Sequence, residues 1–487
     1  MIIYCRDKEM KELESISRDS RLGSNFVLIV GGRKVGKTTF VKEYLERAGG
    51  IYISVNIKSS QMQLNEISSY LKTLDLGGQY IPGFRHWEDF FLYIVHLARS
   101  QSITLVIDEF QNLGNIERGV YKTLKDIWAS KPQNTKLNLI AVTNNGGFLQ
   151  DNFHSTAGTL YHINDHTLSI KPFRFSEVYK IFQMHSSVLP VRDVRKIFAV
   201  FGGQPKFYDL FDRLNLWNCS VKEILSELVF RKFAPVSSEL NVLLQSEYSK
   251  GSKVFISILQ AIASGKTTVT EIAKEVTIPA TSVIMYLKDL EKKKEIIKRA
   301  VPLGTKDLSK SKNGRYYFRN NFDHFWFRYV QPEIINYEMG QFDRLCDNVV
   351  DDLDNYVKDR YGLIASEIVN ENIKQPEILK ITGDKEVSAG PLWTRKSSFD
   401  LAFIGKESPV IKLCWFVWED ERITDGEINI LRQKLAEIQK QYVNYKTELI
   451  VFFEDHNSSE IVTPLPVESI KYYHEFPDVR IFTYRNN

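Results

Sequence analysis

The segment GGRKVGKT, at residues 31–38, is the densest group of residues in this sequence that could do chemistry. It matches the pattern G-x-x-x-x-G-K-[ST] and stands between the apolar run NFVLIV and the helical stretch TFVKEYLERA. Gly31 and Gly36 let successive backbone N–H groups close around phosphate oxygens, while Lys37 would neutralise the β- and γ-phosphates. Thr38 would place its hydroxyl on Mg²⁺. The pattern therefore predicts a site for ATP and Mg²⁺.

Polar residues at the ends of two further apolar runs extend this prediction. ITLVIDEF ends in two acids, of which we expect Asp108 to associate with Mg²⁺ and Glu109 to be the base that polarises the attacking water. LNLIAVTNN ends in polar residues, of which Asn144 is the predicted contact to the γ-phosphate and Thr143 the next candidate. The residues predicted to bind the nucleotide are Gly31, Gly32, Arg33, Lys34, Val35, Gly36, Lys37, Thr38, Thr39 and Asp108.

A strongly basic stretch lies between Lys288 and Arg319. It contains eleven Lys and Arg against four Asp and Glu, whereas the whole chain has a net charge of only +4. Three helical patterns precede two strand patterns around a polar loop, which is the order of a winged helix with residues 279–293 as recognition helix. Double-stranded DNA is therefore a candidate partner, and a solvated basic face or an internal lever is the alternative. The residues predicted to contact DNA are Thr281, Ser282, Tyr286, Lys288, Lys310, Lys312 and Arg315.

The composition predicts a multidomain protein without membrane segments. The chain has 487 residues, which exceeds the roughly 250–300 residues at which a single hydrophobic core stops growing. No apolar run is long enough to cross a bilayer, and charges at residues 6–8 interrupt the place of a secretory apolar core. A cytoplasmic location is expected. The four cysteines are far apart and form no CxxC pair, so they are predicted to be reduced core thiols.

The elements that must position these residues fall into several regions. Residues 24–170 alternate five short β-branched runs with amphipathic stretches, which predicts a parallel sheet covered by helices. Helical patterns with a break at Gly202 and Gly203 follow, and strand patterns return in the last third of the chain. The expected domains are an ATPase core at 1–171, a helical lid at 172–235, a winged helix at 236–320, a linker at 321–340 and an α/β domain at 341–487.

Six segments of the chain, in a fixed order, carry a family resemblance. They are CRDKEMKEL near the start, GGRKVGKT, LVIDEFQ, SIKPFRFSEV, GGQPKFY at 202–208 and RNNFDHFWFRYVQP at 319–332. Together they resemble the prokaryotic ATPases of the AAA/STAND group that carry a C-terminal DUF234 segment. The resemblance implies a multidomain α/β protein: a P-loop domain of the ASCE class with a parallel sheet, a helical lid, a winged helix and a restriction-endonuclease-like domain of the PD-(D/E)xK type.

The C-terminal segment departs from the nuclease pattern that the resemblance implies. Asp400 matches the metal-binding acid, but Lys412 and Cys414 stand where the next strand of the family carries its glutamate and lysine. Glu367 matches the family's first-helix acid, with a solvated helix glutamate as the alternative. A cation at a ligand position repels Mg²⁺, so Asp400 is a lone metal candidate and we expect no cleavage of nucleic acid. A shifted metal site that uses the acids at 419 and 420 is the remaining alternative.

A second departure concerns the rate of ATP hydrolysis. Family members usually carry a Gly-Arg pair after a Leu-Tyr before the fifth strand, and this chain has His162 and Ile163 there. Loss of a cation near the γ-phosphate predicts slow hydrolysis. We therefore expect a switch ATPase that couples ATP to binding of DNA, of a protein trigger or of another copy of itself, in defence or another DNA-linked process. The alternatives are an ATP-dependent DNA nuclease and a DNA-binding regulator with a vestigial ATPase.

Overall fold

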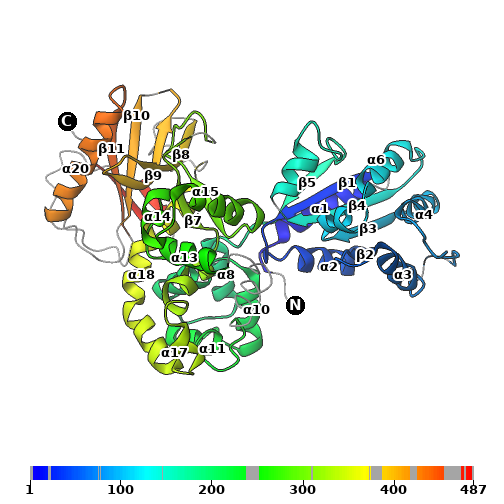
Figure 1. Ribbon diagram of the computed structural model, residues 1–487, viewed down its shortest axis with the longest axis horizontal. Coiled ribbons are helices and arrows are strands. Elements are labelled where there is room, and N and C mark those ends of the chain that lie inside the picture. Colours follow the sequence, from blue (N-terminus) through cyan, green and yellow to red (C-terminus); the bar gives the residue numbers. More distant parts are fainter. Residues whose placement is uncertain are drawn as a thin grey trace. The chain divides into compact units, whose positions relative to one another are not determined.

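The computed structural model describes residues 4–19, 23–74, 76, 78–144, 146–236, 252–308, 311–371, 373, 386–407, 409–416, 425–453, 473–476 and 479–484. The chain forms two compact units (Figure 1). The first unit contains residues 1–187 and 203–217, and the second contains residues 188–202 and 218–487. The chain therefore passes between the units three times, once between Gly202 and Gly203, where the sequence predicts a break.

The first unit is built on a five-stranded parallel sheet with the strand order β2-β3-β4-β1-β5. Each of the five β-branched runs of the sequence forms one strand, so the predicted parallel sheet is confirmed. Because parallel strands share a direction, their carboxyl ends meet along one edge. The strands are β1 (Asn25–Gly31), β2 (Ile51–Ser54), β3 (Ile103–Asp108), β4 (Leu137–Asn144) and β5 (His166–Ser169).

Helices cover both faces of this sheet. Alternate residues of β1 face opposite layers: Val27 and Ile29 pack with α1 and α2, whereas Phe26 and Leu28 pack with α3, α4 and α6. A strand that is buried on both faces reads as a continuous apolar run, as NFVLIV does. The helices of the first unit are α1 (Asp7–Asp19), α2 (Lys37–Ala48), α3 (Ser60–Leu71), α4 (Trp87–Ser100), η1 (Phe110–Asn112), α5 (Leu113–Ile116), α6 (Val120–Ser130), α7 (Gly147–Leu149), η2 (Gln150–His154), α8 (Phe175–Met184) and α10 (Pro205–Leu214).

The second unit begins with helices and a two-stranded antiparallel hairpin. In α14 the Thr268 side chain accepts from the backbone N–H of Glu271, and the Glu271 carboxylate accepts from the backbone of Thr268, which closes a capping box. The sequence predicts one helix over 279–293; this segment forms α15 and a π-helical turn, η3. The elements are α9 (Val191–Phe201), α11 (Val221–Leu228), α13 (Ser252–Ala263), α14 (Val269–Val276), α15 (Ala280–Lys288), η3 (Asp289–Lys293), β6 (Ile297–Ala300), β7 (Arg315–Phe318), α16 (Asn321–Phe325), η4 (Trp326–Val330), α17 (Ile334–Glu338) and α18 (Phe342–Glu371).

A six-stranded mixed sheet with the order β12-β13-β11-β10-β9-β8 ends the chain. Strands β8, β9 and β10 are antiparallel neighbours, and β11 runs parallel to β10 after the crossover helix α20. These elements are β8 (Val387–Trp393), β9 (Ser398–Gly405), β10 (Val410–Phe416), α20 (Asp425–Gln441), β11 (Lys446–Phe453), β12 (Tyr473–Phe476) and β13 (Val479–Tyr484). Among the residues that the structure describes, no helix is both long and apolar enough to cross a bilayer.

Helix α18 approaches this sheet closely at Gly362. A Cβ added at this glycine would lie 2.9 Å from Cγ of Asp400 on β9 and nearer still to one carboxylate oxygen. Glycine inside a helix costs about 1 kcal/mol relative to alanine. The close approach to Asp400 gives a physical reason for this glycine in the middle of a long helix.

We predict that Gly362→Ala destabilises the protein by about 1–3 kcal/mol, because the overlap with Asp400 outweighs the gain in helix propensity. Denaturant unfolding followed by tryptophan fluorescence measures the change. The double variant Gly362→Ala/Asp400→Ala should recover most of the loss, since it removes the overlapping carboxylate. Gly83→Ala, where no atom lies within 4 Å of an added Cβ, is the control. Equal stability of Gly362→Ala and the wild type would contradict this account of the packing.

Candidate functional site

The loop between β1 and α2 has the backbone that anion binding requires. Lys34 and Gly36 have φ values of 64° and 88°, so two left-handed residues turn the loop within three positions. Helix α2 begins at Lys37, directly after this turn, and its first N–H groups have no partner within the helix. Gly31 must be a glycine because an added Cβ would overlap the carbonyl of Ile170. Loop N–H groups and a helix N-terminus thus converge on one anion site.

Lys37 is the cation of this site and is only 8% exposed. Its Nζ donates to the carbonyl oxygens of Gly31 and Gly32 at 3.0 and 2.8 Å, and to Oδ1 of Asn144 at 2.8 Å. Asn144 is the last residue of β4, the neighbour of β1 in the sheet. Of the remaining residues predicted in this loop, Arg33 and Lys34 are exposed and Val35 is buried.

Asp108 joins the loop to the neighbouring strand β3. It is 2% exposed, and its Oδ2 accepts from the hydroxyl of Thr38 at 2.7 Å and from that of Tyr52 at 2.9 Å. Its other oxygen accepts from the backbone N–H of Glu109 at 2.8 Å. Burial and the Asp108 charge raise the pKa of Tyr52 well above its usual range, so this hydroxyl stays protonated at neutral pH. Thr38 and Asp108, the predicted Mg²⁺ pair, therefore do lie together.

Glu109 stands at the end of β3 in the left-handed region, with φ at 52°. One of its carboxylate oxygens accepts a hydrogen bond from Nε2 of Gln111. Oε1 of Gln111 in turn accepts from the hydroxyl of Thr143 on β4 at 2.8 Å. Gln111 thus connects the predicted base to the predicted γ-phosphate strand, a role that we did not predict from the sequence. In the sequence, the only feature that points to Gln111 is that it is a polar residue two positions after Glu109 in LVIDEFQ.

Three of the segments that carry the family resemblance meet beside this loop. Arg6, which is 5% exposed, donates to the carbonyl of Lys171 and lies over the ring of Phe173 at 4.8 Å. The backbone N–H of Phe173 donates to the carbonyl of Gly203 at 2.7 Å. An added Cβ at Gly36 would lie 3.4 Å from Cγ of Pro205, the first residue of α10. Helix α10 therefore begins against the phosphate-binding loop.

The predicted nuclease positions lie in different surroundings within the second unit. Nζ of Lys412 lies 3.5 Å from Glu448 on the adjacent strand β11, and both side chains are nearly buried. Cys414 is 1% exposed, and burial raises the pKa of its thiol, as a core cysteine requires. Glu367 lies 3.5 Å from Lys298. No group of three His, Cys, Asp or Glu that could hold a metal occurs among the described residues, which exclude the acids at 419 and 420.

The residues predicted to contact DNA lie on α15 and on the hairpin. Thr281 and Lys288 are exposed on one face of α15, together with Ile284 and Met285. Ser282 and Tyr286 are half-buried, and the Tyr286 ring packs edge-on against Phe255 with centroids 5.1 Å apart.

The hairpin residues differ in their surroundings. Lys312 is exposed, whereas the Arg315 guanidinium lies 4.8 Å from the ring centroid of Trp393 on β8. Lys310 lies outside the described residues. The structure leaves Thr281, Lys288 and Lys312 exposed to solvent and places Arg315 against the terminal sheet.

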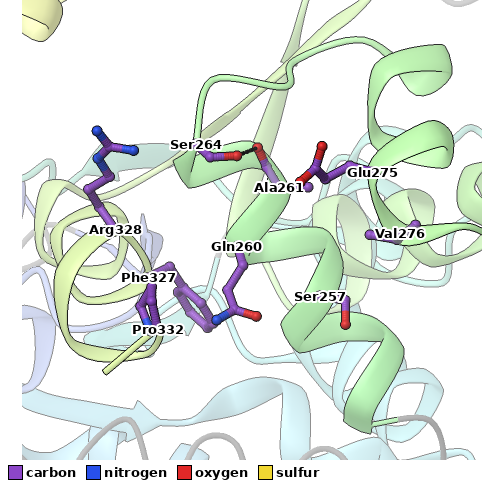
Figure 2. Close-up of a pocket in the computed structure, with 9 residues that line it drawn as sticks. All are labelled: Ser257, Gln260, Ala261, Ser264, Glu275, Val276, Phe327, Arg328 and Pro332. Atoms are coloured by element: carbon purple, nitrogen blue, oxygen red, sulfur yellow. Dashed lines mark hydrogen bonds between the residues drawn. The ribbon is translucent and has the colours of Figure 1, made fainter. Parts of the chain in front are cut away.

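A separate pocket of about 420 Å³ lies in the second unit between α13, α14 and η4 (Figure 2). Gln260 and Phe327 approach one another on one side of it, and Glu275 stands on the opposite wall. The Ser264 hydroxyl bonds the carbonyl of Ala261 in its own helix. The lining contains none of the residues that the sequence predicts for chemistry.

Comparison with known proteins identifies two regions of the chain. Residues 4–209 match a family described as an ATPase domain predominantly from Archaea. Residues 326–427 match the DUF234 family, described as archaeal and bacterial proteins of unknown function. An uncharacterized protein of Methanocaldococcus jannaschii is 24% identical over 467 residues, which cover 95% of this chain and 96% of that protein.

Solved structures with a similar fold include a Walker-type ATPase of Pyrococcus abyssi. It has 18% identity and a TM-score of 0.51, and the match covers 67% of this chain and 96% of that one. The Orc1 protein of Aeropyrum pernix, solved in complex with DNA, matches with 13% identity and a TM-score of 0.35 over 69% of this chain and 94% of that one. The first of these likenesses supports the P-loop fold.

We predict that Thr38→Val raises the Mg²⁺ concentration needed for ATP binding by about tenfold or more, because it removes the hydroxyl that lies between the loop and Asp108. Thr38→Ser keeps the hydroxyl and should behave like the wild type. Titration of Mg²⁺ against a fluorescent ATP analogue measures the difference. If Thr38→Val and Thr38→Ser required the same Mg²⁺ concentration, Thr38 would have no part in metal binding.

Proposed function

We propose that this chain, a P-loop ATPase with a C-terminal DUF234 segment, binds and slowly hydrolyses ATP and uses its nucleotide state to control contact with duplex DNA. The hydrogen bonds that join Lys37 to Asn144 and Thr38 to Asp108 carry this proposal. They bring a cation and a hydroxyl from the first turn of α2 together with a carboxylate at the end of β3 and an amide at the end of β4, at one edge of the sheet. Each of these groups suits the triphosphate and Mg²⁺ of ATP better than any organic anion without a metal.

In this proposal each residue of the site has a distinct role. The loop N–H groups and Lys37 would hold the β- and γ-phosphates, and Thr38 and Asp108 would hold Mg²⁺, which supplies charge neutralisation when bound. Asn144, already bonded to Lys37, stands where it can distinguish ATP from ADP. Glu109 would orient and polarise the attacking water.

Two observations favour slow turnover. The Glu109 carboxylate already accepts a hydrogen bond from Gln111 on one of its oxygens, and this bond restrains its orientation although the remaining lone pairs can accept from water. Ile163, at the position where related ATPases usually carry an arginine, is buried in the core of the first unit. A switch that keeps ATP bound fits these features better than a motor with rapid hydrolysis.

Duplex DNA is the partner that the second unit supports best. Helices α13, α14 and α15 followed by the β6–β7 hairpin have the order of a winged helix, and the backbone N–H of Tyr316 ties β7 to the α13–α14 turn at 2.8 Å. In this proposal Thr281 and Lys288, on the exposed face of α15, would read the major groove. A protein trigger or a second copy of the chain is the alternative partner, favoured by the apolar Ile284 and Met285 on the same face.

Glu109→Gln should leave ATP binding intact and slow hydrolysis by about a hundredfold or more, because it removes the carboxylate and keeps the Mg²⁺ residues. Lys37→Ala should lose tight ATP binding, whereas Lys11→Ala, an exposed site on α1, is the control. Calorimetry and phosphate release measure the two properties. An undiminished rate in Glu109→Gln would show that the water is activated by another residue.

The variants Glu109→Gln and Lys37→Ala also test whether the bound nucleotide controls DNA binding. Glu109→Gln with ATP and Lys37→Ala without nucleotide represent the two end states, so their affinities for duplex DNA at low salt should differ by about tenfold or more. Equal affinities would mean that nucleotide does not control DNA binding. Absence of DNA binding in both, with ATP hydrolysis intact, would leave an ATPase whose partner is a protein.

The C-terminal sheet should not cleave nucleic acid. Lys412 occupies the position that the resemblance assigns to a glutamate and is paired with Glu448, so it brings a positive charge where a second metal-binding carboxylate is needed. Incubation with duplex and single-stranded DNA and with RNA, in Mg²⁺ or Mn²⁺ with ATP, should give no products. Cleavage that Asp400→Ala abolishes would overturn this expectation, and cleavage that persists in that variant would indicate a contaminant.

A further inference from the structure

Five basic side chains from three separate elements border one region of the second unit. They come from the β6–β7 hairpin, the β8–β9 turn and α20, and we call them the basic seam: Lys312, Arg315, Arg395, Lys396 and Lys434. Lys312, Arg395 and Lys396 are exposed, and Arg315 and Lys434 are half-buried. We propose that the basic seam binds the phosphate backbone of duplex DNA beside the α15 recognition face. This inference rests on the proposed function for its partner and extends the predicted wing contacts Lys312 and Arg315 to the β8–β9 turn and α20, which the winged-helix order does not predict.

Direct contacts fix the hairpin against the β8–β9 edge. Nε1 of Trp393 donates to the carbonyl of Asn313 at 3.1 Å, and Arg315 lies over the same indole ring. Leu303, in the connection between β6 and β7, donates its backbone N–H to the carbonyl of Pro391 on β8 at 2.8 Å. The hairpin and the terminal sheet therefore present one continuous surface.

The turn between β8 and β9 is well defined and carries two of the cations at its tip. The N–H of Ser397 donates to Oγ1 of Thr394 at 3.1 Å, and the N–H of Thr394 donates to the carbonyl of Ser397 at 2.8 Å. Arg395 and Lys396 stand between these two residues. A closed turn holds their side chains outward, where they can reach phosphate oxygens.

Helix α20 continues the surface. Lys434 lies over the Trp415 ring at 4.5 Å, and its charge acts on Asp400, as does that of Arg315. The pKa of Glu437 is lowered mainly by its bonds to Lys440, with a smaller contribution from Lys396, so the turn lies within electrostatic range of α20. Lys434 and Arg315 thus both act on Asp400, and Lys396 acts on Glu437 of α20, so the hairpin, the turn and α20 lie close together.

The acids near the seam do not cancel its charge. The charges of Lys434 and Arg315 both act on Asp400, but neither cation forms an ion pair with it within 4 Å, and burial raises the pKa of its carboxyl. Glu437 is paired with Lys440 at 3.0 Å. The Glu271 carboxylate accepts from Thr268 in the cap of α14. Among the described residues around the seam, five cations therefore face two carboxylates that have no ion pair, Asp400 and Glu271, which leaves a net positive surface for an anion.

The surroundings of the tryptophans favour a duplex over a single strand. Proteins that bind single strands stack unpaired bases on exposed aromatic rings. Trp393 is only 5% exposed and is covered by Arg315, and Trp415 is covered by Lys434. The buried Trp393 offers no stacking surface and the half-buried Trp415 carries a cation over its ring, so the seam offers mainly charge and hydrogen-bond donors, which suit the backbone of a duplex.

Fluorescence anisotropy with a 30-base-pair duplex and the full-length protein, in the presence of a non-hydrolysable ATP analogue, tests the seam. Arg395→Gln/Lys396→Gln/Lys434→Gln should weaken binding by about tenfold or more at low salt. It should also make the slope of log K against log salt shallower by about two to three, since each phosphate contact contributes about 0.9. The double variant Arg395→Gln/Lys396→Gln, confined to the exposed turn, should show a smaller change in the same direction.

Matched controls separate this inference from the proposed function. Lys11→Gln/Arg344→Gln/Lys406→Gln removes the same charge at exposed sites elsewhere and should bind DNA like the wild type. If the seam variants match this control while Thr281→Ala/Lys288→Ala loses binding, the seam is refuted and the winged-helix proposal stands. Tighter binding of a single strand than of the duplex would also refute it. If the wild type binds no duplex in any nucleotide state, the DNA part of the proposed function fails together with the seam, and ATP hydrolysis is unaffected.

Discussion

A buried cation at the carboxyl edge of a parallel sheet constrains most of the first unit. An ammonium group that is 8% exposed needs acceptors, and Lys37 obtains them from two loop carbonyls and from Asn144. The loop must therefore fold back under α2, which requires left-handed residues at positions 34 and 36. Strand β4 must lie beside β1 so that Asn144 is within reach. The pairing of β4 with β1 and the conformation of the loop together satisfy this one charge.

A second set of hydrogen bonds connects the predicted catalytic residues to the strands β3 and β4. Thr38 bonds Asp108 on β3, and Gln111, just beyond β3, bonds both Glu109 and Thr143 on β4. A change in hydrogen bonding at Asn144, where the γ-phosphate would bind, therefore occurs next to Thr143. Thr143 bonds Gln111, which in turn bonds Glu109. This arrangement offers a physical route by which the occupant of the loop could alter Glu109 without a large movement of the sheet.

Short sequence patterns were enough to predict the phosphate-binding loop, the parallel sheet and the acids beside the loop. The loop, its flanking strand and helix and the acids of LVIDEF are encoded within short stretches, so the five strands and the closeness of Thr38 to Asp108 could be anticipated. Contacts between distant residues could not. The bond between Gln111 and Thr143 depends on β3 and β4 being neighbours. Lys412 reads as an unpaired cation until the register places Glu448 opposite it. Arg315 reads as a solvated charge until β8 brings Trp393 beneath it.

The threefold passage of the chain between its two units has a practical meaning for fragments. Helix α9 belongs to the second unit, where Phe201 stacks on Phe322 with centroids 5.9 Å apart and Asn321 donates to the carbonyl of Phe198 at 2.8 Å. Helix α10, only a few residues later, belongs to the first unit. No single cut yields either unit whole: a fragment that ends after α10 carries α9 with its apolar side stripped of partners. Neither unit can therefore be obtained as one continuous segment of the chain, and a truncation that is meant to isolate the ATPase unit must keep the partners of α9 or remove α9.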